Sequence, residues 1–318
     1  MSLEKLEIQF LPNPNVIYKV DDDLGFENVN FGLSTSGKLT IEQVDSLRLV
    51  FYSQSNKQLT QSYPQSLLQH YVRRNADNFI LHNFHHLFPR PCDIDRLVIS
   101  LFTNNHSVLQ DTISLVKYQQ SNSYRLPFNS TWFVSSGHDF GVEHRRHLSR
   151  GHFAWDFVRI NHIGKSATGN SLDSYFSYGQ VVLAPADGVV IAIHDGETDN
   201  APGRIESKKP NFIEIDHGGN EISRLVHLKM GSIIVATGDT VKSGQPIAKV
   251  GNSGYSERPH LHIGFQQYIP DKNGETLAVP IAVQFSNYQV SWNQGVDQPV
   301  SSGRPRRGQF LRTVSGER

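Results

Sequence analysis

The sequence has almost no cysteine, no excess charge of either sign and no long apolar run. Its 318 residues include one cysteine, Cys92, which excludes an intramolecular disulfide and a cysteine-based structural zinc site. The 30 basic and 30 acidic side chains give a formal net charge of zero, so the overall charge favours neither nucleic acid nor an anionic membrane surface. No segment reaches the roughly 18 apolar residues of a membrane-spanning helix. We therefore expect no nucleic-acid partner and no integral membrane segment in this chain.

The patterning of the first part of the chain predicts mainly β structure. Residues 46–52 (SLRLVFY) and 96–102 (RLVISLF) alternate apolar and polar side chains, and an Asn-Asn pair at 104–105 signals a turn before a return strand through 113–115. Short strands at this spacing predict an amino-terminal, β-sandwich-like domain over residues 1–122. The length of the chain leaves room for about one further domain.

Three other segments have distinct compositions. Pro64 at a first turn predicts a helix over residues 64–74. The polar stretch QQSNS at 119–123 predicts the linker to a second domain over residues 123–290. Residues 291–318 are rich in Ser, Gly, Arg and Gln, and we expect them to form a mobile tail.

The second domain contains five residues with the chemistry of a metal site. They are His152 and Asp156 in HFAWDF, His227 in RLVHL, and His260 and His262 in PHLHIGF. In a strand, the last two would share one face while the residue between them turns inward. A fully extended HFAWD would separate its His from its Asp by roughly 13 Å, so a bend must bring them together. Two imidazoles and one carboxylate, with a fourth position for water, are typical of catalytic zinc.

The ordered set of motifs resembles the lysostaphin-type (LytM-like) zinc endopeptidases, which cut peptide bonds in bacterial peptidoglycan. That family has HxxxD, a valine-rich strand pair around AxxGxV, a strand ending in His, GxxVxxGQ and HxH. Over about residues 124–290 this chain has, in the same order, HFAWD, VVLAPADGVV, RLVHL, GDTVKSGQPIAKVG and HLHIGF. The resemblance implies a β-rich peptidase domain of the duplicated hybrid motif type. Two positions depart from the family's pattern: Ala154, where Gly is usual, and Leu225, where Tyr is common.

Transferred residue by residue, the resemblance implies one zinc ion per chain, bound by His152, Asp156 and His262. It implies that His260 and His227 are the uncoordinated catalytic pair. We expect His260 to be the general base and His227 to orient the water or donate to the developing oxyanion, but the two roles are interchangeable on this reasoning. The predicted reaction is zinc-dependent hydrolysis of peptide bonds in peptidoglycan cross-links or bridges, with peptidoglycan peptides as the partner.

Two other classes of function have some support in the sequence. A LytM-like domain can regulate another wall hydrolase without catalysis, or be latent, but such regulators commonly lose metal ligands and all five positions are present here. LAPADGVV and GDTVKSGQPIAKVG also resemble a biotinyl or lipoyl carrier domain, yet residues 252–254 (NSG) stand where a carrier needs an exposed lysine. The histidines of residues 82–86 and 138–147 lack carboxylate partners at metal-site spacing, and we expect them to be structural.

The predicted location follows from the substrate class. Residues 1–15 lack the apolar core of an export signal, which taken literally indicates a cytosolic protein. Peptidoglycan lies outside the membrane, so the resemblance implies export. We therefore expect a periplasmic or extracellular protein whose export signal has been removed.

Overall fold

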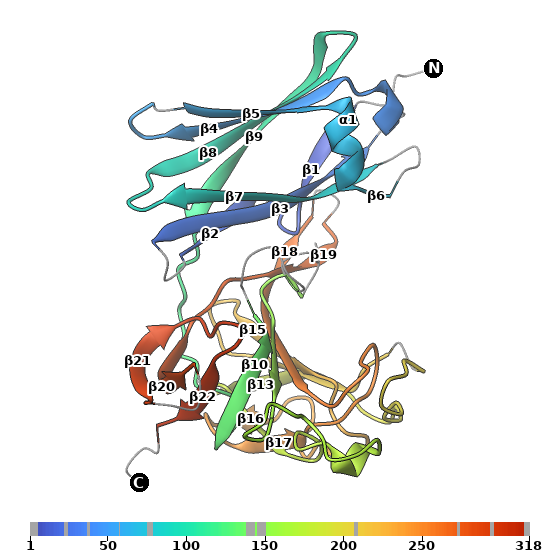
Figure 1. Ribbon diagram of the computed structural model, residues 1–318, viewed down its shortest axis with the longest axis vertical. Coiled ribbons are helices and arrows are strands. Elements are labelled where there is room, and N and C mark those ends of the chain that lie inside the picture. The colour runs from blue at the N-terminus through green and yellow to red at the C-terminus, as the bar shows by residue number, and fades with distance from the viewer. Residues whose placement is uncertain are drawn as a thin grey trace. The chain divides into compact units, whose positions relative to one another are not determined.

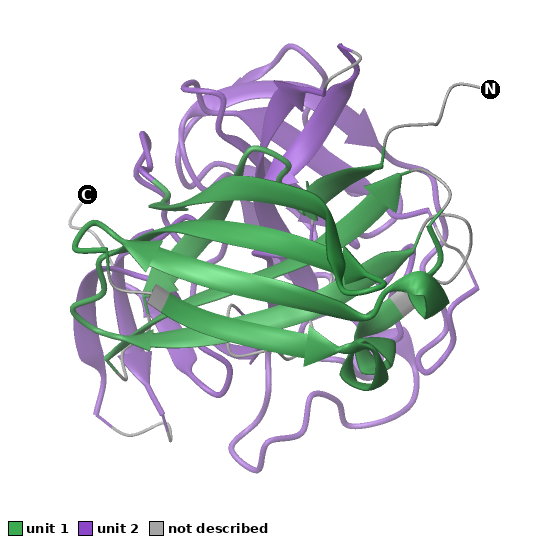
Figure 2. Ribbon diagram, turned by 90° about the horizontal axis from the view of Figure 1, so that it is seen from above, with its two compact units in different colours: residues 1–118, 140–149 green, residues 119–139, 150–318 purple. Residues whose placement is uncertain are grey.

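The structure, a computed structural model, divides the chain into two compact units (Figures 1 and 2). Unit 1 comprises residues 1–118 and 140–149, and unit 2 comprises residues 119–139 and 150–318. Within the described part of the chain, no helix is both long and apolar enough to cross a membrane. The structure describes residues 6–21, 25–36, 39–56, 58–74, 79–137, 144, 151–206, 209–271, 274–292 and 296–314.

Unit 1 is built almost entirely of strands. Its strands are β1 (Glu7–Leu11), β2 (Val16–Asp21), β3 (Phe26–Ser36), β4 (Ser46–Ser53), β5 (Gln58–Pro64), β6 (Val72–Arg74), β7 (Ile80–Pro89), β8 (Ile94–Thr103) and β9 (His106–Lys117). Its short helical turns are η1 (Ile41–Gln43), α1 (Gln65–Leu68) and η2 (Gln69–Tyr71).

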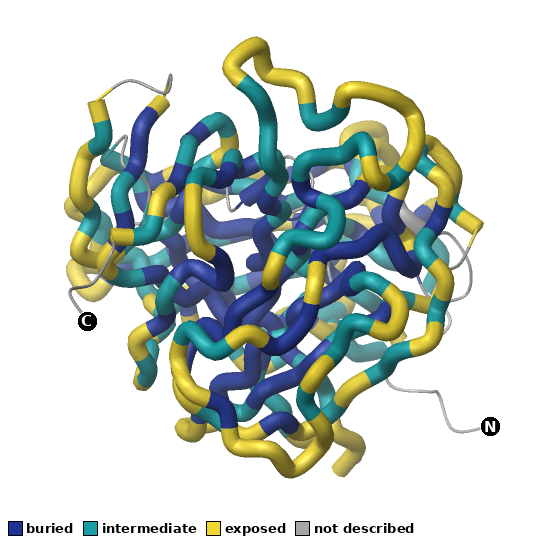
Figure 3. Tube along the Cα trace, turned by 90° about the horizontal axis from the view of Figure 1, so that it is seen from below, coloured by how far each residue is buried: buried dark blue, intermediate teal, exposed yellow. Residues whose placement is uncertain are grey.

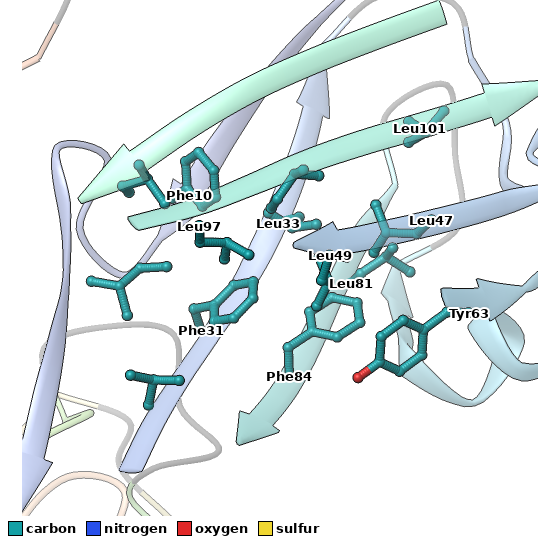
Figure 4. Packing of buried hydrophobic residues seen from close by; sticks show 14 of the residues in the cluster. Phe10, Phe31, Leu33, Leu47, Leu49, Tyr63, Leu81, Phe84, Leu97 and Leu101 are labelled. Atoms are coloured by element: carbon teal, nitrogen blue, oxygen red, sulfur yellow. The ribbon is translucent and has the colours of Figure 1, made fainter. Parts of the chain in front are cut away.

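These strands form a sandwich, as the sequence predicts. The pairing order is β5-β4-β8-β9-β2-β3-β7-β6, with β1 also pairing with β3. Strand β2 joins the two layers, because residues 16–19 run parallel to β9 while residues 20–21 pair antiparallel with β3. Apolar side chains of both layers, among them Phe31, Leu49 and Phe84, meet in one buried core (Figure 4).

Unit 1 has the turn predicted at residues 104–105 but not the long helix predicted over residues 64–74. Asn104 and Asn105 both have positive φ, 48° and 61°, which suits the tight hairpin turn predicted between β8 and β9. The helix predicted over 64–74 is instead limited to the single turns α1 and η2. It ends there because Val72 pairs with Leu81 as β6 joins the edge of the sheet.

Unit 2 is a second β-rich body. Its strands are β10 (Thr131–Ser136), β11 (Trp155–Val158), β12 (Val181–Leu183), β13 (Gly188–His194), β14 (Phe212–Asp216), β15 (Ile222–Val226), β16 (Thr240–Val241), β17 (Pro246–Lys249), β18 (Leu261–Pro270), β19 (Thr276–Pro280), β20 (Phe285–Ser291), β21 (Gln298–Gly303) and β22 (Phe310–Thr313). Its described residues also include the 3-10 turn η4 (Leu172–Ser174). The large sheet has the order β16-β13-β14-β15-β18-β11-β10-β22-β20-β21, β19 pairs with β18, and β12 and β17 form a small separate sheet.

The core of unit 2 packs against one face of the large sheet. Trp155 and Phe157 alternate with half-buried neighbours along β11, and both are fully buried. The Trp155 ring lies 4.9 Å from that of Phe285, and its indole N–H donates to the carbonyl of Pro305 at 2.9 Å. Buried segments accordingly run through the middle of the tube in Figure 3, while exposed segments form its periphery. The apolar side of β11 thereby fixes the strand whose other side carries Asp156.

The predicted linker at 119–123 is anchored to unit 2. The carboxylate of Glu221, which is fully buried, accepts backbone N–H bonds from Ser121 at 2.7 Å and Asn122 at 3.1 Å. It also accepts a hydrogen bond from the Tyr124 hydroxyl at 2.7 Å. Several donors are what a buried carboxylate needs to offset its loss of water.

The end of the chain differs from the mobile tail predicted for residues 291–318. Residues 298–303 and 310–313 form β21 and β22, and β22 inserts between β10 and β20 of the large sheet. The prediction was wrong because the mostly polar composition of residues 291–318 hides a short apolar segment around Leu311. Leu311 is fully buried and is paired with Trp132 across the ladder, so it completes the core rather than facing solvent.

This packing predicts that unit 2 needs its last strands. We expect a fragment of residues 119–314 to fold, and a fragment of residues 119–290, which removes the partner of Trp155 and the buried Leu311, to lose cooperative unfolding or several kcal/mol of stability. Tryptophan fluorescence during urea unfolding measures this, because all three tryptophans of the chain lie in unit 2. Equal stability of the two fragments would contradict this prediction.

The division of the chain after residue 122 stays a prediction. A 119–314 fragment that does not fold would count against this division.

His86 is a buried titratable group in the core of unit 1. Its ring lies 4.7 Å from that of Phe51 and 6.3 Å from that of Phe31, and within the described part of the chain its Nε2 atom has no hydrogen-bond partner. Burial, with a smaller repulsion from His85, lowers the pKa of His86 to about 4. Between this value and 6.5, its pKa when unfolded, the unfolded chain binds more protons than the fold does.

Unit 1 should therefore lose stability on acidification. The contribution of neutral His86 is complete above pH 6.5 and falls as the pH drops toward 4, by about 3 kcal/mol in total. All three tryptophans lie in unit 2, so the unfolding of unit 1 is the transition that calorimetry detects and tryptophan fluorescence does not. The melting temperature of that transition should show this pH dependence in the wild type and in His106→Gln, a control at an exposed position. We expect His86→Leu to flatten it. The same pH slope in His86→Leu as in the wild type would refute the assignment.

Candidate functional site

The centre of the site is a pair of side chains on adjacent strands. β11 and β18 are antiparallel, and their register places Asp156 directly opposite His262. Because opposed residues share a face of the sheet, the two side chains meet, and Nδ1–H of His262 donates to Oδ1 of Asp156 at 2.8 Å. Both side chains are about one-fifth exposed, so the pair is open to a ligand on the outer face.

His260 joins this pair from the residue before β18. Leu261 is fully buried while His260 and His262 are not, as the alternation along a strand requires. Nε2 of His260 lies 3.4 Å from Oδ1 of Asp156. Its Nδ1–H donates to the carbonyl of Arg258 at 2.7 Å, which directs Nε2 toward the site.

His227 reaches the same place from the end of β15. It follows Val226, which is paired with His262, and its φ of 61° lies in the left-handed region. This conformation costs a non-glycine residue on the order of 1 kcal/mol. The imidazole centroid lies 4.7 Å from that of His260, and its Nδ1–H donates to the carbonyl of Ser253 at 2.7 Å. Neutral His227 and neutral His260 are thus held in the same tautomer, with Nε2 as the proton acceptor.

The electrostatic surroundings of the two histidines differ. Burial, reinforced by His260 and His262, lowers the pKa of His227 well below its ordinary value. Burial also disfavours protonation of His260, but the charge and hydrogen bond of Asp156 outweigh it and raise the pKa of His260. A cation bound to Asp156 would oppose that effect, because it neutralises the carboxylate.

His152 lies one turn before β11. The backbone N–H of Ala154 donates to the carbonyl of Gly151 at 3.2 Å, which supplies the bend that the HxxxD spacing requires. The His152 ring is fully buried and stands edge-on to Phe153, with centroids 4.6 Å apart. Among the described residues, His152 belongs to no group of three whose ligand atoms all lie within 4.8 Å of one another.

One such group consists of His227, His260 and His262. The structure therefore brings together a triad of histidines and, beside it, the Asp156–His262 pair of the predicted set. It does not group the third predicted ligand, His152, with that pair. Zinc binds imidazole nitrogen and carboxylate oxygen at about 2.0–2.2 Å, so neighbouring ligand atoms of a tetrahedral site lie about 3.4 Å apart. The distance between Oδ1 of Asp156 and Nδ1 of His262, 2.8 Å, would have to increase by about 0.6 Å to reach this value. The donor set suits zinc. The Nδ1 bonds of His227 and His260 leave Nε2 of each ring as the acceptor, which suits a metal ligand and a proton carrier alike.

The two backbone carbonyls that orient these histidines belong to one loop, residues 251–258. Asn200 holds this loop from inside the protein: its Nδ2 donates to the carbonyls of Gly254 at 2.6 Å and Ser256 at 2.9 Å. Asn252 donates in return to the carbonyl of Asn200 at 2.9 Å and accepts from the Ser256 hydroxyl at 2.7 Å. Each of these side chains is buried, so the network is fixed rather than exchanged with water.

Asn211 and two glycines complete the support of the loop. The N–H of Asn211 donates to the Ser253 hydroxyl at 3.0 Å, and its side chain donates to the carbonyl of Leu228 at 3.0 Å. A Cβ on Gly251 would lie 2.4 Å from the backbone of Lys229, and a Cβ on Gly254 would lie 2.7 Å from the backbone of Pro210. The GNSG segment, residues 251–254, thus allows the loop to approach the backbones of Lys229 and Pro210 closely, beside the left-handed His227.

This loop is the part of the site that the sequence did not predict. Its contribution is two carbonyl oxygens, those of Ser253 and Arg258, and every residue type has a carbonyl. The signal that could have found it is the glycine spacing in GNSG immediately before PHLH, which marks a close backbone approach beside a candidate catalytic histidine.

Comparison with known proteins gives the family of this region. Residues 168–277 match the sequence model of Peptidase family M23. An uncharacterized metalloprotease of Buchnera aphidicola subsp. Baizongia pistaciae is 35% identical over 98 residues, which are 31% of this chain and 23% of the relative. Peptidoglycan DD-endopeptidase ShyC of Vibrio cholerae is 31% identical over 104 residues, 33% of this chain and 23% of that protein. The chain thus matches less than a quarter of the length of these curated relatives.

Solved structures of the same kind are more distant. The catalytic domain of lysostaphin from Staphylococcus simulans is 20% identical, with a TM-score of 0.27, over 47% of this chain and 88% of that chain. A zinc-containing peptidase from Vibrio cholerae is 14% identical, with a TM-score of 0.31, over 83% of this chain and 84% of that chain. The family match includes His227, His260 and His262, whereas His152 and Asp156 precede it. Residues 168–277 therefore match peptidase family M23, which confirms the lysostaphin-type resemblance of the motifs that they contain.

Proposed function

We propose that the chain is a zinc-dependent endopeptidase that hydrolyses peptide bonds in bacterial peptidoglycan. The observation that carries the proposal is the Asp156–His262 pair, set on adjacent strands beside two histidines whose Nδ1 atoms are occupied by backbone carbonyls. A ligand pair next to a pair of proton carriers is what amide hydrolysis by water requires. The peptidoglycan endopeptidase among the relatives supports the choice of substrate, and that choice places the site of action in the periplasm or outside the cell.

Zinc would be held by Asp156, His262 and His152, where it would act as a Lewis acid and would lower the pKa of a bound water to about 7. The protein's own groups then handle the protons. His260, whose Nε2 faces Asp156, takes the proton of the attacking water as the new C–O bond forms. It returns that proton to the nitrogen of the breaking C–N bond. His227, held against Ser253, orients the water or donates to the oxyanion.

The first test concerns the ligands. We expect one zinc per wild-type chain by elemental mass spectrometry, and loss of stoichiometric zinc in His262→Ala, Asp156→Ala and His152→Ala. His227→Ala should keep its zinc, because its ring is assigned to proton transfer. If the site were the triad of histidines instead, His227→Ala would lose the metal and Asp156→Ala would keep it. The exposed His162, replaced by Ala, is the control for nonspecific loss.

The second test concerns catalysis. His260→Ala and His227→Ala should keep zinc and fold, yet lower the rate of peptide-bond cleavage by about 10²–10⁴-fold, the usual contribution of a general acid–base group. Mass spectrometry of the fragments released from purified peptidoglycan measures both the rate and the bond that is cut. Full activity in either zinc-loaded variant removes that residue from the mechanism. A zinc-loaded wild-type protein that cuts no peptide bond favours the regulator alternative.

A further inference from the structure

Unit 2 has a hollow on the same sheet that does not include the proposed metal ligands. This hollow, of about 250 Å³, lies over β10, β22 and the segments that follow β11 and β20. The side chains on which its chemistry depends are Thr131, Phe133, Arg159, Asp297, Phe310 and Arg312. All of them lie outside residues 168–277, the segment that matches family M23. The family match therefore does not account for this hollow.

The register of the sheet places the hollow on the same face as the candidate metal site. Phe133 is paired with Val158 on β11 and with Phe310 on β22, so these three side chains share one face. Val158 is two residues beyond Asp156 and is likewise half-buried, whereas Phe157 between them faces the core. At about 3.3 Å per residue, the row formed by Val158, Phe133 and Phe310 lies roughly 7 Å along β11 from Asp156.

The hollow has an apolar floor. The rings of Phe133 and Phe310 lie 5.1 Å apart, and neither side chain is fully buried. Two partly exposed aromatic rings side by side give a surface against which the apolar part of a peptide residue can pack. A volume of about 250 Å³ is below that of a complete small-molecule site, roughly 300–1,000 Å³. It suits one residue or the end of a chain.

The rim of the hollow is cationic. Arg312 donates from Nε to the Thr131 hydroxyl at 3.2 Å and pairs with Asp297 at 3.0 Å. These contacts fix the Arg312 guanidinium, and they also use Asp297, the one carboxylate among the described residues that line the hollow. Arg159 donates its backbone N–H to Ser177, and its guanidinium has no hydrogen bond or ion pair with any described residue. Two guanidiniums against one carboxylate leave an excess positive charge.

We propose that this hollow binds a carboxylate group of the substrate peptide, with Arg159 as the principal contact. A guanidinium offers two parallel N–H donors that match the two oxygens of a carboxylate. A peptide anchored there by a chain end or an acidic side chain would extend along the sheet face, with its backbone over Asp156 about two to three residues away. The inference rests on the proposed function and makes it more specific: the substrate is an acidic peptide.

The test is a binding experiment that does not depend on turnover. The probe is a soluble, uncross-linked tetrapeptide released from peptidoglycan, in its free-acid form and with its carboxylates amidated. Titration calorimetry with the full zinc-loaded chain gives the dissociation constant of each. We expect amidation to weaken binding about tenfold or more, and Arg159→Ala to weaken binding of the free acid by a similar factor. Arg159→Ala should leave binding of the amidated peptide unchanged.

Two further variants sharpen the result. Arg159→Lys keeps the charge but loses the two-pronged donor geometry, so it should restore only part of the affinity. Arg204→Ala removes a guanidinium that is 75% exposed elsewhere in unit 2 and should change nothing. Equal binding of the acid and the amide by the wild type, an equal effect of Arg159→Ala on both, or no binding of the free acid would each overturn the inference. Cleavage without this binding pattern rejects the inference alone, whereas binding without cleavage rejects the proposed function alone.

Discussion

The site depends on one strand pairing, the antiparallel ladder between β11 and β18. This pairing brings together two residues, Asp156 and His262, that lie 106 positions apart in the sequence, and it places them on the same face of the sheet. A slip of one strand by one residue in this register would turn its member of the pair, Asp156 or His262, into the core. The same slip would bring the buried Trp155 or the buried Leu261 to the outer face, and the burial of these two side chains therefore opposes it. The packing of the core therefore determines how Asp156 and His262 are positioned relative to each other.

The loop at residues 251–258 determines the orientation of His227 and His260. The loop contributes no side chain to the proposed proton transfers, yet its carbonyls fix which nitrogen of His227 and of His260 carries the proton. Asn200 and Asn211 hold the loop through buried hydrogen bonds. Because each of these bonds is made inside the protein, the two histidines are oriented before any substrate arrives. The cost of ordering them is met during folding and not during binding.

Much of this arrangement is visible in the sequence, and the remainder is hidden for physical reasons. Strand alternation predicts that His260 and His262 share a face, and the HxxxD spacing predicts a bend, which the structure has at Gly151–Ala154. The carbonyl contacts are not predictable from residue types, because every residue has a carbonyl and the loop that supplies them is held by the distant Asn200 and Asn211. Strands β21 and β22 are also missed, since a polar composition with few apolar residues conceals the one residue, Leu311, that completes the core. The metal ligands and catalytic roles stay predictions.

The most direct test of the metal site is to locate the ion. Crystals of the full chain with zinc bound, measured on both sides of the zinc absorption edge, give an anomalous difference map that needs no assumption about ligands. The account predicts one peak within about 2.3 Å of Oδ1 of Asp156 and Nδ1 of His262, with His152 as the third ligand. A peak coordinated by Nε2 of His227 and His260, with Asp156 uninvolved, would contradict it.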